Sequence, residues 1–330
     1  MHVDLRQLRH AQALAAHGSF SRAAESLKIA QPTLSRSIKE LESRVGLALF
    51  NRSRSGHEPT DFGRVFLEHA AELIGGLEDL NREVALAKGL ESGEVSVGLG
   101  PYVVEALAPS SGARFAAAHP SVRLRILTDD PVLLARLLRL RKIDLCVADA
   151  GLLVDDEFEI VARLAPLPGN IVVRAEHPLL GKRNIGVAEL LGYPFAQVVT
   201  LPSRMLKPIL ALRRPMRGPS QPPPFPAIEC PTVRLALDIV ANSNAFTIAT
   251  LGMIRADLEA RSLDVVLHEP WMHTEWNIVR LRKRSMSPAM IAIVAELERA
   301  HAEVMLEETV LRRKWYPVGG VRKGLSRQRR

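Results

Sequence analysis

The sequence predicts an α/β protein with a small all-helical unit at its N-terminus, and three observations support this. Residues 19–46 show two short helical patterns with a tight break between them. From about residue 94, strand and helix patterns alternate, as in a parallel sheet covered by helices. A length of 330 residues suffices for about two domains.

The first predicted helix runs from Asp4 to about Ala16, and Gly18 ends it. Four apolar positions at helical spacing are expected to face inward, so this helix supports the two that follow. These positions are Leu5, Leu8, Ala11 and Ala15.

The next two helices form a closely spaced pair. The first spans residues 20–27 and follows Ser19, which suits an N-cap. The second begins near Gln31 with Pro32 in its first turn, and Gly46 closes it. The apolar positions of the pair are Phe20, Ala23, Ala24, Leu27, Leu34, Ile38, Leu41 and Val45.

Polar and basic side chains lie off the apolar stripe of the second helix. Amide, hydroxyl and cationic groups near a helix N-terminus are those that read base edges and bind phosphates in the major groove. An ordinary helical hairpin with a solvated face is an equally good explanation of this pair taken alone. The candidate DNA-binding residues of the pair are Ser19, Ser21, Gln31, Pro32, Thr33, Ser35, Arg36 and Lys39.

A basic, turn-rich segment follows the helical pair. Leu49 and Phe50 are its apolar anchor, and Arg52, Arg54 and His57 project from the loop that comes next. Such a loop is usually solvated surface, but directly after two such helices it favours a wing that contacts the DNA backbone or minor groove. These three residues complete the predicted DNA-binding set.

The segments AAESL and AQPTLSRSIKELESRVGLALFNRS, followed by Pro59, Thr60 and Gly63, resemble the winged DNA-binding domain of LysR-type transcriptional regulators. The resemblance covers residues 1 to about 90 and implies a winged helix-turn-helix domain. Ala30 stands where the family usually has Ser or Thr, which removes a side-chain cap worth roughly 0.5–2 kcal/mol.

Composition and charge agree with a cytoplasmic protein that has a nucleic-acid partner. No run of about 18 apolar residues and no apolar signal core occur. Cys146 and Cys230 are far apart, which argues against a disulfide framework or a zinc site, and no metal or cofactor is expected. The net charge of +8 combines +4 in residues 1–60 with +8 in residues 312–330, so the rest is mildly acidic.

A long helix is predicted from Thr60, its cap, to about Lys88, with Gly75 and Gly76 as a weak point. Its apolar residues approach a heptad repeat, so we favour a seam between two copies over packing on its own domain. The resulting partner is a second copy, in a homodimer or homotetramer. The expected dimerisation residues are Phe66, Leu73, Leu77, Leu80 and Val84.

The part after a short hinge resembles the two-lobed regulatory domain of the same family, which is similar in fold to periplasmic solute-binding proteins. A βαβαβ run predicts a largely parallel first sheet. Strands are expected at 94–100, 122–128, 143–149, 159–164, 170–174, 196–200, 245–249 and 275–283, with 263–269 leading back to the first lobe. Helices are expected at 103–118, 132–140, 204–212, 232–241 and 287–311.

The predicted organisation has four parts. They are the winged helix-turn-helix domain 1–60, the linker helix 61–89, the effector-binding domain 90–311 and a disordered basic tail 312–330. The lobes of the effector-binding domain are lobe I at 90–163 and 269–311, and lobe II at 164–268. The Pro-rich segment 213–226 is expected to be an exposed loop, which is either a tolerated surface insertion or a partner site. The basic tail is expected either to increase the solubility of the protein or to add non-specific attraction to phosphate.

Ligands in such folds bind at the carboxyl ends of strands between the lobes. By resemblance, hydroxyls and helix N-terminal amides would hold the effector there, favouring a carboxylate, with Arg204 adding a charge. Asp129 and Asp130 argue instead for a cationic or polyol ligand. Phe246 stands where the family often has Gly, which would narrow the pocket. Each of these candidate residues, taken alone, also fits the role of an ordinary turn or cap residue. The candidate effector-binding residues are Pro101, Tyr102, Val103, Thr128, Asp129, Pro202, Ser203, Arg204, Phe246 and Thr247.

The predicted function is a sequence-specific transcriptional regulator, not an enzyme, whose α/β domain senses a small-molecule effector. Its expected partners are double-stranded DNA, a second copy, the effector and RNA polymerase. An enzyme would need a nucleophile with a base, a metal cluster or a phosphate loop, and the sequence shows none. A constitutive DNA-binding regulator, in which the lobes only oligomerise, is the remaining alternative.

Overall fold

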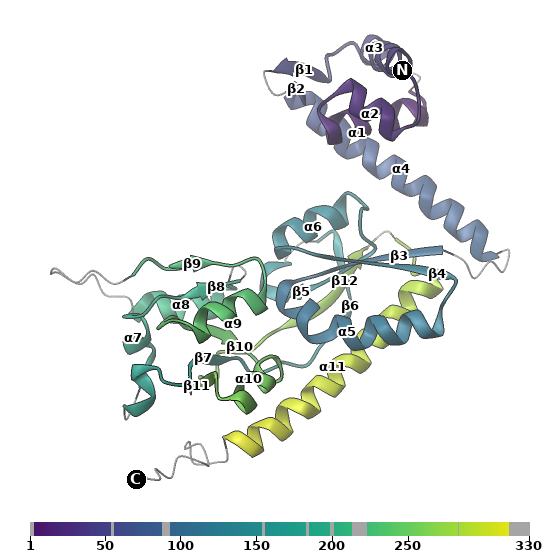
Figure 1. The fold of residues 1–330 in the computed structure, drawn as a ribbon. Helices are drawn as coiled ribbons and strands as arrows, with labels where there is room; N and C mark the ends of the chain where they lie inside the picture. Colours follow the sequence, from purple (N-terminus) through teal and green to yellow (C-terminus); the bar gives the residue numbers. More distant parts are fainter. Residues whose placement is uncertain are drawn as a thin grey trace. The chain divides into compact units, whose positions relative to one another are not determined.

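The computed structural model describes residues 3–53, 56–87, 93–153, 156–182, 185–198, 201–212, 223–282 and 284–316. The chain divides into two compact units, of which the first comprises residues 1–91 with 139–142 and the second the remainder. Figure 1 labels the helices and strands of both units.

The first unit is helical with one hairpin. Its elements are α1 (Leu5–His17), α2 (Phe20–Ser26), α3 (Gln31–Val45), β1 (Phe50–Ser53), β2 (Gly56–Pro59) and α4 (Asp61–Ala87). A capping box at Asp4 begins α1, and Gly18, with a φ of 61°, ends it. The predicted three-helix unit and hairpin are confirmed, but Leu5 is 38% exposed, and Leu14 is buried instead.

The apolar stripe of helix α4 packs on α1 in its first part and is exposed further along. Phe66 and Ala70 pack with Leu8 of α1, so this part of the stripe belongs to the core of the first unit. Further along, Leu73 and Leu80 are 62% and 55% exposed. The helix is continuous through its two adjacent glycines. The packing on α1 therefore explains only the first half of the near-heptad pattern.

The first subdomain of the second unit contains a five-stranded sheet in the order β4-β3-β5-β12-β6. Its elements are β3 (Gly93–Leu99), α5 (Pro101–Ala118), β4 (Val122–Thr128), α6 (Pro131–Arg139), β5 (Leu145–Asp149), η1 (Ala150–Leu152), β6 (Phe158–Arg163), β12 (Trp276–Leu281) and α11 (Pro288–Trp315). Strand β3 is parallel to β4 and β5, whereas β12 is antiparallel to both of its neighbours. The expected largely parallel sheet is confirmed.

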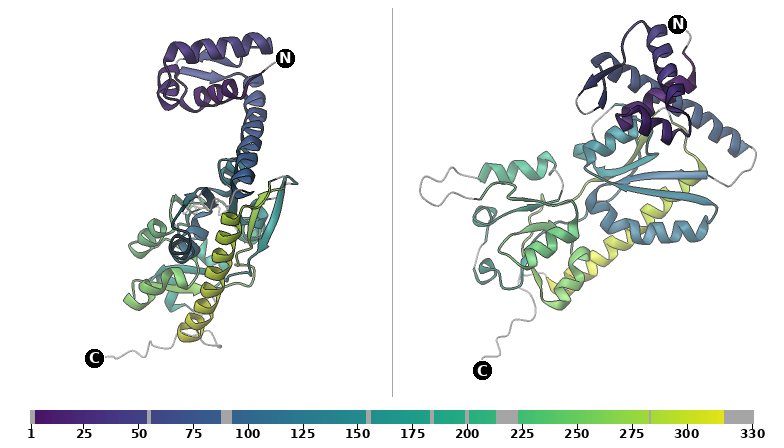
Figure 2. Two further views of the ribbon diagram at one scale, coloured as in Figure 1. Left: turned by 90° about the vertical axis from the view of Figure 1, so that its right-hand side faces the viewer. Right: turned by 45° about the horizontal axis from the view of Figure 1, so that its top comes forward.

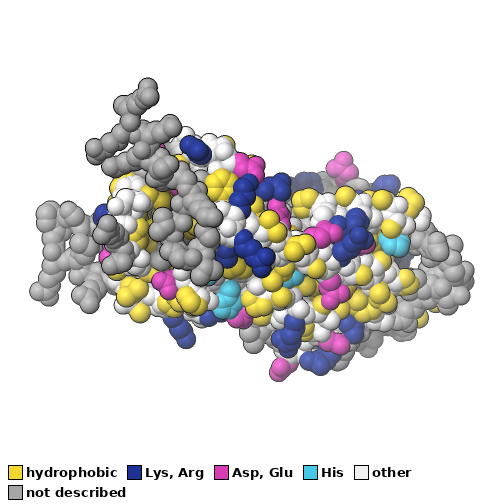
Figure 3. Space-filling model, turned by 90° about the horizontal axis from the view of Figure 1, so that it is seen from below, with side chains coloured by type: hydrophobic (Ala, Val, Ile, Leu, Met, Phe, Trp, Pro, Cys, Tyr) yellow, Lys and Arg dark blue, Asp and Glu magenta, His cyan; other side chains and the backbone are white. Residues whose placement is uncertain are grey.

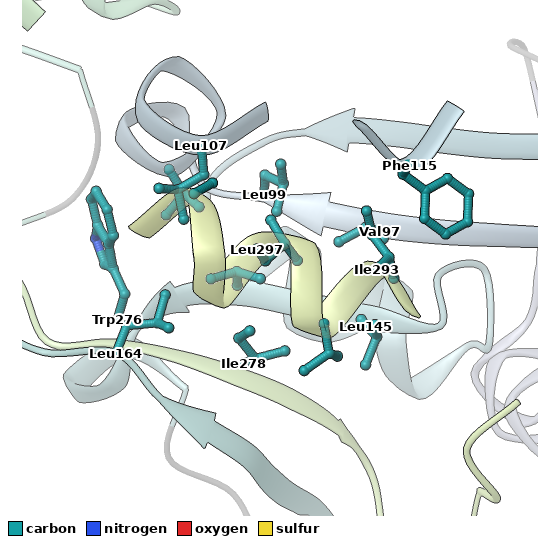
Figure 4. Packing of buried hydrophobic residues seen from close by; sticks show 14 of the residues in the cluster. Val97, Leu99, Leu107, Phe115, Leu145, Leu164, Trp276, Ile278, Ile293 and Leu297 are labelled. Carbon is teal, nitrogen blue, oxygen red and sulfur yellow. The ribbon is translucent and has the colours of Figure 1, made fainter. Parts of the chain in front are cut away.

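Helices bury both faces of this sheet, as the alternation in β5 shows. Leu145 and Val147 belong to the core shared with α5 and α11, whose packing is shown in Figure 4. Cys146 and Ala148 face the other way and pack with α6. On that side a Cβ at Gly98 would lie 2.6 Å from Cδ1 of Ile143, so a larger residue there would make the Ile143 side chain shift. Burial on both faces is typical of parallel sheets.

The second subdomain contains an antiparallel three-stranded sheet, β10-β7-β11, and the short pair β8-β9. Its elements are β7 (Asn170–Arg174), η2 (Pro178–Gly181), α7 (Val187–Leu190), β8 (Ala196–Gln197), α8 (Ser203–Leu212), β9 (Ile228–Glu229), α9 (Val233–Ala241), β10 (Thr247–Ala249), η3 (Gly252–Ile254), α10 (Arg255–Ala260) and β11 (Leu263–Leu267). Residues 263–269 were expected to lead back to the first lobe, but residues 263–267 form β11, which pairs with β7 within the segment 164–268 that was assigned to lobe II, and the chain returns through 268–275. Helix α11 lies along α5 and then contributes Leu311 to the second subdomain's core (Figure 2).

Two sequence expectations about exposed segments are corrected. Residues 312–315 are the last turn of α11, where the Arg312 guanidinium donates to Asn170 Oδ1 at 3.0 Å. The Phe225 ring stacks on Phe195 at 5.0 Å, so the end of the Pro-rich segment is packed rather than exposed. Residues 213–222 and 317–330 lie outside the described residues.

The surface of the face shown in Figure 3 is chemically mixed. Over its described part, basic, acidic and hydrophobic side chains are interspersed. In the described part of the chain, no helix has the length and apolar character needed to cross a bilayer.

Candidate functional site

The candidate DNA-reading face is the outer side of α3. Leu34, Ile38 and Leu41 on its inner side are 0%, 2% and 0% exposed, and they pack with residues of α1 and α2. This packing fixes the helix about its axis. The exposed residues on the outer side are Gln31, Pro32, Thr33, Arg36 and Lys39, with Ser35 half-buried beside them.

In the described part of the chain, no side chain caps the N-terminal end of α3 or neutralises its charge. Ala30 occupies the N-cap with no side-chain hydrogen bond, and the first turn holds no acidic residue. The partial positive charge of the helix end is therefore unshielded and available to a phosphate. At α2, Ser19 is the N-cap residue, but its side chain makes no capping bond either, and Ser21 is exposed.

The wing is tied to α3 by one side chain. Glu42 Oε1 accepts hydrogen bonds from the N–H groups of Leu49 and Phe50, at 2.8 and 3.2 Å. At the base of α4, Gly63 N–H donates to Thr60 Oγ1 at 2.8 Å, and this hydroxyl donates to Ala48 O at 2.9 Å. The predicted cap at Thr60 is thus confirmed, and it fixes the other side of the wing.

Strand β2 of the wing contacts the end of α1 and the start of α2. His57 N–H donates to Gly18 O at 2.8 Å, and the His57 ring packs edge-on against Phe20 with ring centroids 4.7 Å apart. Arg52 lies in β1 opposite His57, and Arg54 lies outside the described residues. These two contacts of the half-buried His57 therefore hold the wing in place. They do so independently of any contact that His57 makes with DNA.

The second unit contains a cavity between its two subdomains. Its volume is about 690 Å³, including the open space at its mouth. The N-terminal turn of α5, the ends of β5 and β10, the start of α8 and the returning segment before β12 form its walls. The lining residues are Gly100, Pro101, Tyr102, Val103, Pro131, Ala148, Asp149, Leu152, Gly169, Leu201, Pro202, Met205, Ile248, Ala249, Thr250, Met253, His273, Thr274 and Trp276.

A charge cluster lies at the edge of the cavity. Arg204 at the start of α8 donates from Nη1 and Nη2 to the two Asp149 oxygens, at 2.6 and 2.5 Å. Its Nη2 also donates to His273 O at 2.8 Å, and its Nε lies 3.4 Å from Glu275 Oε1. Burial disfavours the guanidinium charge, but the two carboxylates outweigh this and raise the pKa of Arg204.

Two hydroxyl groups distinguish the cavity wall. Thr250 is 4% exposed, and its buried Oγ1 has no hydrogen-bond partner within the described part of the chain. Burial raises the pKa of the Tyr102 hydroxyl above its usual value, although a hydrogen bond with Thr247 opposes this. Tyr102 is therefore a neutral group, and Thr250 offers an unused donor and acceptor.

Other reactive side chains are part of the core. Cys146 is fully buried in a strand, and burial raises its thiol pKa to about 12, which keeps it protonated. His177 is 2% exposed, with Nδ1 accepting from Leu179 N–H at 3.2 Å and Nε2 3.1 Å from Asn244 O. Within the described ranges no group of His, Cys, Asp and Glu is suited to holding a metal ion.

Comparison with known proteins matches both units. Residues 5–64 match the bacterial regulatory helix-turn-helix proteins of the lysR family, and residues 88–302 match the LysR substrate binding domain. The SDS degradation transcriptional activation protein of Pseudomonas sp. (strain ATCC 19151) is 36% identical over 297 residues, covering 88% of this chain and 94% of that relative. The chain belongs to the LysR family. It is a transcriptional regulator with a helix-turn-helix DNA-binding part and an effector-binding part.

Solved LysR-family structures share the fold. Full-length OxyR from Pseudomonas aeruginosa, in a variant form, superimposes with a TM-score of 0.68 at 20% identity, covering 93% of this chain and 97% of that one. Full-length CbnR complexed with its target DNA gives a TM-score of 0.58 at 18% identity, covering 90% and 100%. At this level of identity the likeness concerns the architecture alone.

The cavity brings together only some of the predicted effector residues. Pro101, Tyr102, Val103 and Pro202 line it. The other predicted residues lie outside the lining. They are Thr128, Asp129, Ser203, Arg204, Phe246 and Thr247.

Local hydrogen bonds and core packing explain these positions. Asp129 is exposed and accepts from Asp130 N–H at 2.8 Å, while the guanidinium of Arg204 is held by Asp149. Phe246 packs on Phe195 with ring centroids 5.1 Å apart, so it is part of the second subdomain's core and does not narrow the cavity. Thr247 Oγ1 donates to Ala196 O at 2.8 Å.

Sequence reasoning missed several lining residues. Met205 lies in the first turn of α8, and His273, Thr274 and Trp276 belong to the segment that returns to the first subdomain. No local pattern marks these positions, because they face the cavity only through the way that segment folds back.

Proposed function

We propose that this LysR-family regulator reads duplex DNA with the outer face of α3 and holds its effector in the cavity of the second unit. The observation that carries the DNA proposal is the contrast within α3. Its apolar side is fully buried, whereas Gln31, Thr33, Arg36 and Lys39 are exposed at an uncapped N-terminus. The fold likeness to CbnR complexed with its target DNA supports this assignment.

Pairing through α4 would place two such faces on one operator. Leu73, Leu80 and Val84 are exposed at spacings of seven and four residues, as in a coiled-coil seam. Two copies joined there would read half-sites about 34 Å apart, or a multiple of it. We therefore propose that the α4 seam makes the functional unit a homodimer or a dimer of dimers.

The effector would act by favouring one arrangement of the paired copies. A ligand shifts an equilibrium only by its difference in affinity for the two states. Because the relative from Pseudomonas sp. is named as a transcriptional activation protein, we include RNA polymerase among the proposed partners. We place this activity in the cytoplasm, where duplex DNA and polymerase occur together.

The DNA proposal is tested with a duplex selected by the full chain from a random pool. Arg36→Ala and Gln31→Ala should each weaken binding about tenfold in fluorescence anisotropy, because a bidentate base contact is worth about 1–3 kcal/mol. Arg299→Ala, which removes an exposed guanidinium from α11, is the matched control and should change affinity less than about twofold. Unchanged affinity of both α3 variants would reject this face as the reader.

A further inference from the structure

We propose that the cavity takes an uncharged, largely apolar ligand whose hydrogen-bonding group meets Thr250, and that the Asp149–Arg204 pair disfavours anions. This rests on the proposed effector role of the cavity and adds the chemical class of the ligand. Three features carry it: the apolar wall, the neutralised cation at the edge and the unpartnered hydroxyl.

The wall of the cavity is mainly apolar and comes from both subdomains. Leu152 and Val103 contribute from the first subdomain, and Leu201, Met205 and Ile248 from the second. Each Å² of apolar ligand surface buried there contributes about 25 cal/mol. A charged group on the same surface would lose its hydration without compensation.

The edge of the cavity offers no uncommitted cation. Neither Lys nor Arg is among the described lining residues, and the nearby Arg204 is bound to both oxygens of Asp149. With Glu275 at 3.4 Å, one guanidinium faces two carboxylates. The N-terminus of α5 supplies only about half a positive charge, and its first residue, Pro101, carries no N–H. An anion would therefore have to displace a paired carboxylate to gain a partner.

Thr250 supplies the polar contact. Buried hydroxyls without a partner are rare, because each costs about 1–3 kcal/mol. The residue Thr250 lines the cavity and is 4% exposed, and its buried hydroxyl oxygen is unpartnered in the described structure. It both donates and accepts, so a neutral hydroxyl or carbonyl of a ligand would satisfy it.

Three probes of equal chain length test the class by calorimetry on the full chain: 1-octanol, octanoate and octylammonium, all below their aggregation limits. We expect 1-octanol to bind at least about tenfold tighter than either charged probe. Thr250→Val should weaken 1-octanol about five- to tenfold, and Thr250→Ser should restore it, because only the hydroxyl distinguishes these variants.

Asp149→Asn gives the sharpest outcome. It removes one carboxylate from Arg204, so the affinity for octanoate should rise about tenfold relative to the affinity for 1-octanol. Equal binding of a charged probe to the unmodified chain, no binding of 1-octanol, or indifference to Thr250→Val would overturn the proposal. The proposed effector role is tested by a separate measurement, the footprint of the protein on the selected duplex. If any ligand changes this footprint, the effector role stands even when the proposed ligand class is wrong.

Discussion

The carboxylate of Glu42 in α3 accepts a hydrogen bond from the backbone N–H of Leu49, at 2.8 Å. The same oxygen also accepts from Phe50 at the start of β1. The reading helix and the wing are therefore joined by a side chain that lies off the proposed DNA-contacting surface. Movement of one should be transmitted to the other through this bond.

Replacing Glu42 with Leu should release the wing, because two backbone N–H groups lose their acceptor. The loss of about 1–3 kcal/mol should speed amide exchange in the segment 47–53 by about 5- to 150-fold, measured by hydrogen–deuterium exchange. Glu42→Gln keeps an acceptor oxygen and is the control, with most of the protection retained. Equal exchange in the Leu variant and the unmodified chain would rule out this anchor.

Leu80→Glu should break the paired state, because it places a charge in the exposed half of the α4 stripe. Leu80 is 55% exposed within one copy, so the folded unit should tolerate the change. Sedimentation should give half the mass of the unmodified oligomer or less. Leu47→Glu, at a residue 52% exposed in the loop after α3, should leave the mass unchanged. A Leu80→Glu variant with the parent mass would refute the seam.

Removing Arg284 should strongly destabilise the second unit. Its side chain is 4% exposed and pairs with Asp144, at 5%, whose carboxylate also accepts from Ser96 N–H at 2.6 Å. Arg284→Met leaves that charge buried and should cost about 3–5 kcal/mol. The double variant with Asp144→Asn keeps an acceptor for Ser96 and should recover part of the loss.

This cost is measurable by urea unfolding followed through tryptophan fluorescence. All three tryptophans belong to the second unit, so the signal reports that unit alone. If the double variant is no more stable than Arg284→Met, the loss is due to packing rather than to an unpaired charge.

Acid should destabilise the second unit partly through His301. Burial lowers its pKa below 6.5, against an opposing hydrogen bond to Ala165, so the folded state favours the neutral ring. A lowered pKa contributes stability that is present above pH 6.5 and lost as the pH falls through the folded value.

His301→Phe keeps the edge-on ring contact with Trp276 and removes this titration. Thermal midpoints by circular dichroism should then depend less on pH between about 7 and 5. An unaltered slope in His301→Phe would show that other groups account for the acid sensitivity.

Much of the fold could be predicted from the sequence because the signals were local. The stripe of α3, the cap at Thr60 and the strand at 170–174 depend on residues a few positions apart, and the structure has them within a residue or two of the predicted bounds. Alternation of strands and helices likewise predicted a largely parallel first sheet. The DNA-contacting roles of the α3 residues stay predictions, although their exposure agrees with them.

The cavity could not be predicted to the same depth. Arg204 looked like a free cation beside a helix N-terminus, but its partner Asp149 is 55 positions away in the chain. Phe246 looked like a pocket residue, but Phe195 and the second subdomain's core surround it. Residues 263–269 were expected only to lead back out of the second lobe, and the pairing of β11 with β7 showed that residues 263–267 are a strand of that lobe's sheet.

Periodicity, caps and turns act over one or two helical turns, so they were enough to predict the helix-turn-helix pair, the wing and the alternating α/β domain, while the family followed from the resemblance of particular segments. Three properties became visible only in the folded chain: which half of α4 remains exposed, that Arg204 is neutralised, and that the Thr250 hydroxyl lacks a partner in the described structure. Those properties depend on which distant groups meet when the chain folds, and no short-range pattern encodes such meetings.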